Sequence, residues 1–350
     1  MSILTQHIPD KLFKYYSFDE KFNESRLTGR VFLSTSFSFN DPSDCRLGIE
    51  NNFKEKSRTK DWLYAKLEEV GLNPDDYADG IINNEKAAVD AYWRKQLEKV
   101  GILCLSEDDK NKLLWGYYTN NVGFCVEWDT TKIVKRLALA YVSELDFETT
   151  VLLTTKKNQY FEDPYSRTAK DQKEVDLAFD MIQDSDLDTL KNDYLRTQLL
   201  YTANRPLVRN YVVNCLLKRL GCGNVIYKKL ITPLAAKLFF VSGNEEDVTT
   251  KYYTKTEEWV REQEFRFVCS LGGNMVADLG KDCIKSIRFG CNISFPNLIS
   301  LLCILKRNEM ESVPLYIMKN DPASDSMTAV PLNTSDLYKS LEEMQKITRF

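Results

Sequence analysis

Short apolar runs bounded by turn-forming residues occur along most of the chain, and each run is typical of a β-strand. One turn is marked by Asn40-Asp41-Pro42, because the residue before a proline avoids helical backbone angles. We expect strands at 12–16, 31–36, 102–105, 123–128, 137–142, 224–230, 237–241, 264–270, 284–289 and 313–318.

Two longer segments, 59–100 and 168–221, carry the apolar spacing of amphipathic helices. In the first, Gly71 follows an apolar helix face and is typical of a helix C-terminus. In the second, Asp184 and Ser185 can cap one helix, and Pro206 fits the first turn of another. We expect shorter helices at 109–120 and 296–306.

The order of these elements predicts an α+β fold. A strand-rich core would be built from residues 1–50, 101–160 and 224–350. Helical insertions would occupy residues 51–100 and 165–222. Near the end of the chain, a strand, a helix and a strand follow one another, which predicts a β-α-β crossover between parallel strands.

Composition places the chain among ordinary globular proteins. Of its 350 residues, 43% are hydrophobic and 28% are charged, which excludes general disorder. The formal charge of −4 argues against a strong sequence-independent hold on nucleic acid but leaves room for a local basic groove. The start of the chain shows no signal-peptide pattern, and no apolar run approaches 18 residues. We therefore expect a cytoplasmic protein that does not enter a membrane.

The chain contains nine cysteines but only one histidine, His7. This nearly excludes catalysis by Ser-His-Asp or Cys-His groups, as well as the usual zinc sites. The cysteines are scattered, form no Cys-x-x-Cys motif and mostly lie in apolar runs, so we interpret them as reduced core residues. Chemistry at any active site would then depend on carboxylates, tyrosines and basic side chains.

The segment from Trp259 to Ser270 is the most informative one. If a strand begins early enough, period-two alternation places Glu262, Glu264 and Arg266 on one face and directs the phenylalanines between them into the core. Two carboxylates about 7 Å apart along a strand repel each other, and the arginine can keep one of them ionised. The alternative is a solvated strand face with a salt bridge.

A second segment, 104–128, predicts a strand, a short helix and another strand. Trp115 and Tyr118 are three residues apart and share one face of the helix. Their rings could stack on a flat ligand such as nicotinamide, or they could simply pack the helix against the sheet. A third segment, 40–44, has the oxygen ligands that Mg²⁺ or Ca²⁺ prefers, and a self-capping turn is the alternative.

Together these segments resemble the bacterial domain of unknown function 2971 family, within the ADP-ribosyltransferase-like superfamily. The matching blocks occur in the family's order between about residues 11 and 290. Tyr16 and Tyr117 stand where the family commonly has arginine and histidine. The blocks are Lys14-Tyr15-Tyr16-Ser17, Phe39-Asn40-Asp41-Pro42-Ser43-Asp44, Ser106-Glu107 with Leu114-Trp115-Gly116-Tyr117-Tyr118-Thr119 and Gly123-Phe124-Cys125, and Trp259 to Arg266.

The resemblance implies a split β-sheet core and an NAD⁺-dependent ADP-ribosyltransferase that uses no metal. It also suggests a bacterial toxin or phage-defence effector that modifies RNA, DNA or protein and is restrained by an antitoxin or chaperone. In ADP-ribosyl transfer, nicotinamide leaves as a neutral molecule, so no general acid is needed. The transition state instead needs a fixed carboxylate beside an oxocarbenium-like ribose. That requirement suits a histidine-poor chain.

The resemblance also assigns roles to residues. Glu264 would grip the ribose and stabilise the cation, while Glu262 would orient or deprotonate the acceptor. Tyr118 would stack on nicotinamide, and Lys14 would contact the pyrophosphate or adenosine side. The remaining expected NAD⁺-site residues are Tyr15, Trp115, Ser106, Arg266, Asn40 and Asp41, the last two shaping a loop over the site.

Two other functions remain open from the sequence. One is a non-catalytic module that keeps the same fold and binds a nucleotide or a protein. The other is a metal-dependent nuclease that uses Asp41, Asp44 and nearby acids.

Overall fold

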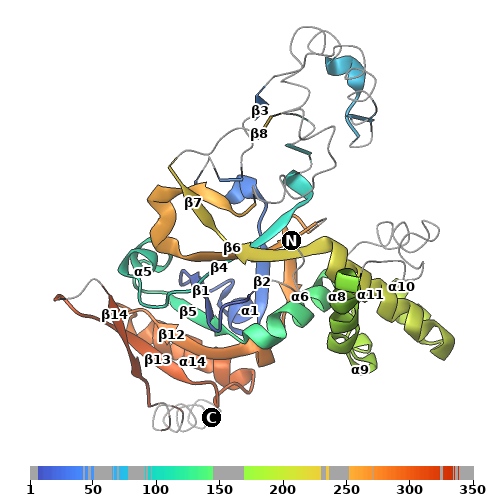
Figure 1. Cartoon of the computed structure of the whole chain (residues 1–350). Coiled ribbons are helices and arrows are strands. Elements are labelled where there is room, and N and C mark those ends of the chain that lie inside the picture. The colour runs from blue at the N-terminus through green and yellow to red at the C-terminus, as the bar shows by residue number, and fades with distance from the viewer. Residues whose placement is uncertain are drawn as a thin grey trace.

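The computed structural model combines helices with one large mixed sheet, which confirms the α+β fold class (Figure 1). No helix within the described ranges is long and apolar enough to span a membrane. The structure describes residues 7–41, 44–45, 49–50, 65, 67–68, 71–77, 91, 94–95, 97–144, 169–229, 234–235, 252–270, 272–323, 326–333, 335 and 338.

The main sheet has eight strands in the order β14-β13-β12-β5-β1-β4-β10-β6. Neighbouring strands are antiparallel, except that β12 and β13 are parallel. Helix α14 (Phe295–Arg307) joins that parallel pair, which confirms the predicted crossover. The strands are β1 (Leu12–Tyr16), β4 (Gly101–Ser106), β5 (Phe124–Trp128), β6 (Leu220–Asn224), β10 (Glu264–Cys269), β12 (Ile284–Phe289), β13 (Leu315–Asn320) and β14 (Met327–Pro331).

The sheet is weakest between β1 and β4. These two strands share only one registered pair, Phe13 with Ser106, whereas β1 pairs with β5 over all five of its residues. The sheet therefore divides into two parts, β14-β13-β12-β5-β1 and β4-β10-β6. This division lies between the fifth and sixth strands of the sheet and positions the site described below.

The two faces of the sheet differ in character. Phe265 and Phe267 of β10 are fully buried in the main hydrophobic core, on the face that the helices cover. The opposite face carries Glu264 and Arg266, whose register partners on β4 are Ser106 and Cys104. Directly paired residues in an antiparallel sheet lie on the same face, so these four side chains are neighbours.

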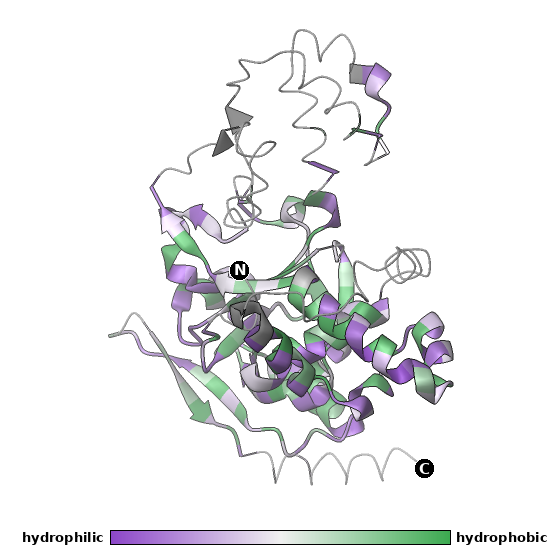
Figure 2. Ribbon diagram, turned by 45° about the vertical axis from the view of Figure 1, so that its right-hand side comes forward, coloured by the Kyte–Doolittle hydropathy of each residue, from purple (hydrophilic) through white to green (hydrophobic). Residues whose placement is uncertain are grey.

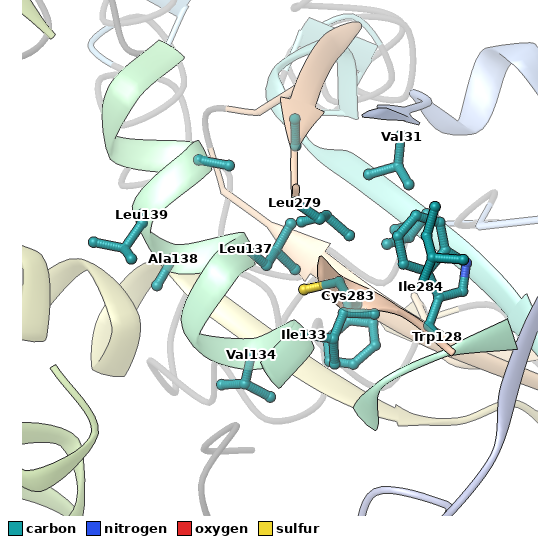
Figure 3. Close-up of a cluster of buried hydrophobic side chains, with 14 of the residues drawn as sticks. Val31, Trp128, Ile133, Val134, Leu137, Ala138, Leu139, Leu279, Cys283 and Ile284 are labelled. Carbon is teal, nitrogen blue, oxygen red and sulfur yellow. The ribbon is translucent and has the colours of Figure 1, made fainter. Parts of the chain in front are cut away.

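Helix α6 (Thr130–Glu144) covers the core face and shows that the strand predicted at 137–142 is wrong. Ile133 and Leu137 are one helical turn apart and point towards Cys283 and Leu279 (Figure 3). The helix packs against both β11 (Met275–Asp278) and α11 (Arg205–Arg219). Because α6 is buried on two sides, the run at 137–142 is continuously apolar, and periodicity cannot distinguish such a helix from a buried strand.

The predicted helical segment 168–221 forms a group of four helices. Their ribbons show hydrophobic and hydrophilic residues side by side, as amphipathic helices do (Figure 2). The cap of α9 is Gln183 and not Asp184, and Pro206 lies in the first turn of α11 as expected. Helix α11 ends at Arg219, two residues before the predicted end at 221, and β6 begins at Leu220. The group is α8 (Ala169–Met181), α9 (Asp184–Leu187), α10 (Asp193–Leu199) and α11.

Shorter elements complete the fold. The strand predicted at 31–36 is β2 (Arg30–Leu33) followed by a single turn, and that predicted at 224–230 is represented by the end of β6 and by β7 (Ile226–Lys228). The strand predicted at 237–241 and most of the helical segment 59–100 lie outside the described residues. The other elements are α1 (Asn23–Leu27), η1 (Ser36–Ser38), β3 (Ile49–Glu50), η2 (Pro74–Tyr77), α5 (Lys112–Thr119), η3 (Thr202–Asn204), β8 (Leu234–Ala235), β9 (Thr254–Thr256), η4 (Glu257–Glu262) and η5 (Lys281–Cys283).

Candidate functional site

A small pocket of about 80 Å³ lies at the division between β1 and β4. Its volume has room for several water molecules or for one part of a ligand. Lys14 lies in the gap between the strands, where its ammonium donates to the carbonyl of Cys104 at 2.8 Å. The lining residues are Phe13, Lys14 and Tyr15 of β1, Cys104, Leu105 and Ser106 of β4, Leu114 and Tyr118 of α5, and Glu262 and Glu264.

Glu262 is the last residue of η4 and does not belong to a strand, because β10 begins only at Glu264. The predicted common strand face is therefore corrected, although both carboxylates still reach the pocket. Gln263, which lies between the two glutamates, adopts left-handed backbone angles (φ 43°) and so turns the chain from η4 into β10. Its carbonyl accepts from the amide of Glu107 at 3.0 Å, and the Glu262 carbonyl accepts from the hydroxyl of Ser106 at 2.7 Å.

Glu262 is 8% exposed, and its carboxylate is held by two donors. The hydroxyl of Tyr118 donates to one oxygen at 2.6 Å, and the ammonium of Lys255 donates to the other at 2.6 Å. The side chain of Asn40 in turn donates to the Tyr118 hydroxyl at 3.4 Å. Burial and the nearby Glu262 raise the pKa of Tyr118, so this phenol stays protonated and acts as a donor.

Glu264 is bound differently. Arg266 donates to both of its oxygens at 2.9 Å and donates to both oxygens of Asp44 at 2.8 and 2.6 Å. Burial alone would raise the pKa of Glu264, but Arg266 and Lys255 outweigh it and lower the pKa to about 2. Because Arg266 is fully buried, the alternative of a solvated strand face is wrong, while the predicted stabilisation of an ionised glutamate by this arginine is confirmed.

Lys255 of β9 joins the whole cluster. Its ammonium lies 2.6 Å from Glu262 and 3.6 Å from both Glu264 and Asp44, and it also lies 4.5 Å from the centre of the Trp259 ring. Burial alone would lower the pKa of Lys255, but the carboxylates of Glu264 and Glu262 raise it. Three carboxylates are thus held around two buried cations.

Sequence reasoning missed several members of this cluster. Lys255 stands between two threonines, a pattern that carries no signal of its own. Tyr227 of β7, whose hydroxyl accepts from the Glu264 amide at 2.9 Å, was also not anticipated. Asp44 lies in the resemblance block 39–44 and was considered only as a metal ligand. The pairing of Arg266 with Asp44 could not be recognised from the sequence, because these two residues are 222 positions apart in the chain.

Trp115 does not line the pocket. Its ring is fully buried and packs edge-on against Tyr15, with ring centres 5.3 Å apart, and its indole nitrogen donates to the Asp109 carbonyl. Tyr15 lines the pocket while its hydroxyl donates to the Asp108 carbonyl at 2.6 Å. Helix packing is therefore the role that the structure shows for Trp115, whereas Tyr118 faces the ligand space.

Asp41 and Asp44 are connected by a backbone hydrogen bond, in which the Asp44 amide donates to the Asp41 carbonyl at 3.1 Å. Asp41 is buried, and both oxygens of Asp44 accept from Arg266. In the part of the chain that the structure describes, no three His, Cys, Asp or Glu side chains are grouped so that they could hold a metal ion. The described contacts of this segment thus join Asp44 to the arginine and Asn40 to Tyr118.

The pocket is lined by side chains of both charges. Glu262 and Glu264 contribute carboxylates, and Lys14 contributes an ammonium that donates to the neutral carbonyl of Cys104 in the contacts described. A ligand that carries a positive and a negative group would match both kinds of charge. No protein-family model matches the chain, and comparisons with curated proteins and with solved structures found no significant match. The chemistry of the site therefore rests on its own geometry.

Proposed function

We propose that the pocket binds NAD⁺ and that the protein is an NAD⁺-dependent ADP-ribosyltransferase. The observation that carries this proposal is the pair of buried carboxylates, Glu262 and Glu264, beside the ring of Tyr118 in one small pocket. NAD⁺ combines a flat pyridinium cation with an anionic pyrophosphate. The pyridinium ring would lie against Tyr118 near the carboxylates, and Lys14 would face the pyrophosphate or the adenosine side.

The charges of the site suit the proposed reaction. A unit charge about 4 Å from a carboxylate gains about 4 kcal/mol near a protein surface. When the glycosidic bond breaks, the positive charge moves from the nicotinamide ring to the ribose, and nicotinamide becomes neutral. Carboxylates that stay ionised would then stabilise the ribose cation while they release the neutral ring. The low pKa of Glu264 keeps at least one such charge present across the physiological range.

The fold and the sequence blocks also support the proposal. The mostly antiparallel sheet divides between β1 and β4, with the pocket at the division, and the resemblance to the ADP-ribosyltransferase-like superfamily implies a split sheet. Three of the four resemblance blocks contribute residues to the pocket, and the remaining block, 39–44, contacts the pocket residue Tyr118 through Asn40. The acceptor would be RNA, DNA or protein in the cytoplasm, and an antitoxin or chaperone would restrain a toxic activity.

A non-catalytic NAD⁺- or nucleotide-binding module is the second candidate. The observation that favours it is that both glutamates already form ion pairs with buried cations. These cations offset the negative charge that the glutamates would otherwise offer to a transition state. Such a module would bind the dinucleotide and leave the glycosidic bond intact.

Incubation with NAD⁺ labelled in the adenylate part, in the presence of a bacterial lysate, tests the proposal. We expect nicotinamide release and transfer of the label to nucleic acid or protein. The double variant Glu262→Gln/Glu264→Gln should lose at least 100-fold of this activity, because it removes the charges that the transition state requires. Glu258→Gln, an exposed residue of η4, is the matched control and should remain fully active.

Three results separate the candidates. Label transfer that depends on the two glutamates supports the transferase. Binding of NAD⁺ without nicotinamide release, with any lysate fraction, would favour the binding module. If the protein neither binds nor consumes NAD⁺, both candidates are wrong.

A further inference from the structure

The two glutamates of the pocket differ in how many hydrogen bonds they already accept. An ionised carboxylate offers about four lone-pair sites. Glu264 accepts two bonds from Arg266 and one from the thiol of Cys104, and the ammonium of Lys255 lies 3.6 Å away. Its capacity is therefore almost filled by groups that are themselves buried.

Glu262 has capacity to spare. The described contacts of its carboxylate are one bond from Tyr118 and one from Lys255, a single donor on each oxygen. About two lone-pair sites remain, and the residue lines the pocket next to the Tyr118 ring, where a flat ligand would lie. Its position is nevertheless precise, because Ser106 holds its carbonyl and the strained Gln263 holds its backbone direction.

The network around Arg266 acts as one unit. The guanidinium is fully buried and makes two bonds to each of two carboxylates, Asp44 and Glu264, and a further bond to the carbonyl of Tyr252. Bidentate pairs of this kind hold a fixed geometry. A carboxylate that is bound this way serves to place its neighbours and cannot turn towards a ligand without exposing the arginine.

From these contacts we infer that Glu262, and not Glu264, is the carboxylate that touches the cationic group of the ligand. Glu264 also lines the pocket, but it belongs with Asp44 and Arg266 to a buried ionic frame. This inference rests on the proposed function for the nature of the ligand, a flat cationic ring. It assigns to Glu262 the contact with the cation that the sequence resemblance implies for Glu264.

A pair of small probes tests the assignment without turnover. The cation 1-methylnicotinamide and neutral nicotinamide differ by one methyl group and one charge. Titration calorimetry gives the ratio of their affinities, which measures how strongly the pocket prefers a cation. We expect the wild-type protein to favour the cation by at least about tenfold, because Coulomb attraction at ring distance exceeds the effect of one methyl group.

The variants then separate the two glutamates. Glu262→Gln should bring the affinity ratio close to one, while the melting temperature falls little, because Lys255 keeps Glu264 and Asp44 nearby. Glu264→Gln should lower the melting temperature by about 6 °C or more and retain the preference for the cation in the folded protein. Glu258→Gln should match the wild type in both measurements.

Each result bears on a particular statement. If Glu262→Gln keeps the preference, the assignment of Glu262 is wrong, whether or not Glu264→Gln folds. Equal loss of the preference in both single variants would also overturn it. If the wild-type protein binds neither probe and does not bind NAD⁺, the proposed function is wrong, and this inference, which rests on it, is wrong as well.

Discussion

Replacing Glu264 by glutamine should make the stability of the protein less sensitive to acid. Glutamine has the shape of a protonated glutamate and removes the charge that Arg266 and Lys255 bind. The pKa of Glu264 is lowered from 4.5 to about 2 in the folded protein. A lowered pKa means that the ionised form stabilises the fold, so this stabilisation is complete well above pH 4.5 and disappears as the pH falls towards 2.

The size of the effect follows from the same shift. Each pH unit between the unfolded and the folded pKa corresponds to about 1.4 kcal/mol, so the ionised carboxylate contributes about 3 kcal/mol at neutral pH. About 2 kcal/mol of this contribution is lost by pH 3. We therefore expect the wild type to be about 3 kcal/mol more stable than Glu264→Gln at pH 7, and the gap to narrow to about 1 kcal/mol at pH 3.

Urea unfolding at a series of pH values between 7 and 3 measures this gap. Other carboxylates with lowered pKa values, such as Glu127 and Asp278, titrate equally in both proteins and cancel in the difference. The exposed Glu258→Gln is the control and should show a gap near zero throughout. A gap that stays constant with pH, or that is below about 1 kcal/mol at pH 7, would refute the role of the Arg266 cluster as a stabilising frame.

Two further substitutions probe the backbone near the site. Gln263→Val should lower the free energy of unfolding in urea by about 1–2 kcal/mol, since β-branched residues tolerate a positive φ poorly. Gln263→Asn should be nearly neutral, and equal stabilities of the two variants would contradict a strained backbone at this position. Gly101→Ala should destabilise the protein by more than about 2 kcal/mol, because the added methyl carbon would lie 2.0 Å from the Gly272 carbonyl oxygen. Gly116→Ala in α5, where the nearest atom lies at 3.9 Å, is its control and should be neutral or stabilising by up to about 1 kcal/mol in thermal unfolding.

The class of fold and most of its elements could be predicted from local patterns. Strands β1, β5, β10 and β12 and helix α14 lie close to the predicted segments. Alternation along β10 also indicated which residues would face the core, because the period of a strand does not depend on its partners. The single clear reversal, α6 in place of a strand at 137–142, arose where burial on two sides removed the polar residues that mark a helix.

The candidate site was only partly visible in the sequence. Glu262, Glu264 and Tyr118 could be selected because each belongs to a short segment with a recognisable pattern, and all three line the pocket. Trp115 shares its segment with Tyr118, yet the rotation of α5 against β1 buries its ring beside Tyr15. Local spacing predicts which residues share a helix face, but not which of them meets a cavity.

Apart from the pair of Glu264 with Arg266, the ion pairs of the cluster were decided only by the tertiary structure. Asp44 and Arg266 are 222 residues apart and form the most buried ion pair of the cluster, and Lys255 reaches three carboxylates from an edge strand. The energy of a charge pair depends on the distance between the two charges in space. For residues far apart in the chain, the order of residues does not set that distance. Residue patterns could therefore indicate carboxylate chemistry, whereas the chain's packing determined which glutamate is held in the frame and which is left open to a ligand.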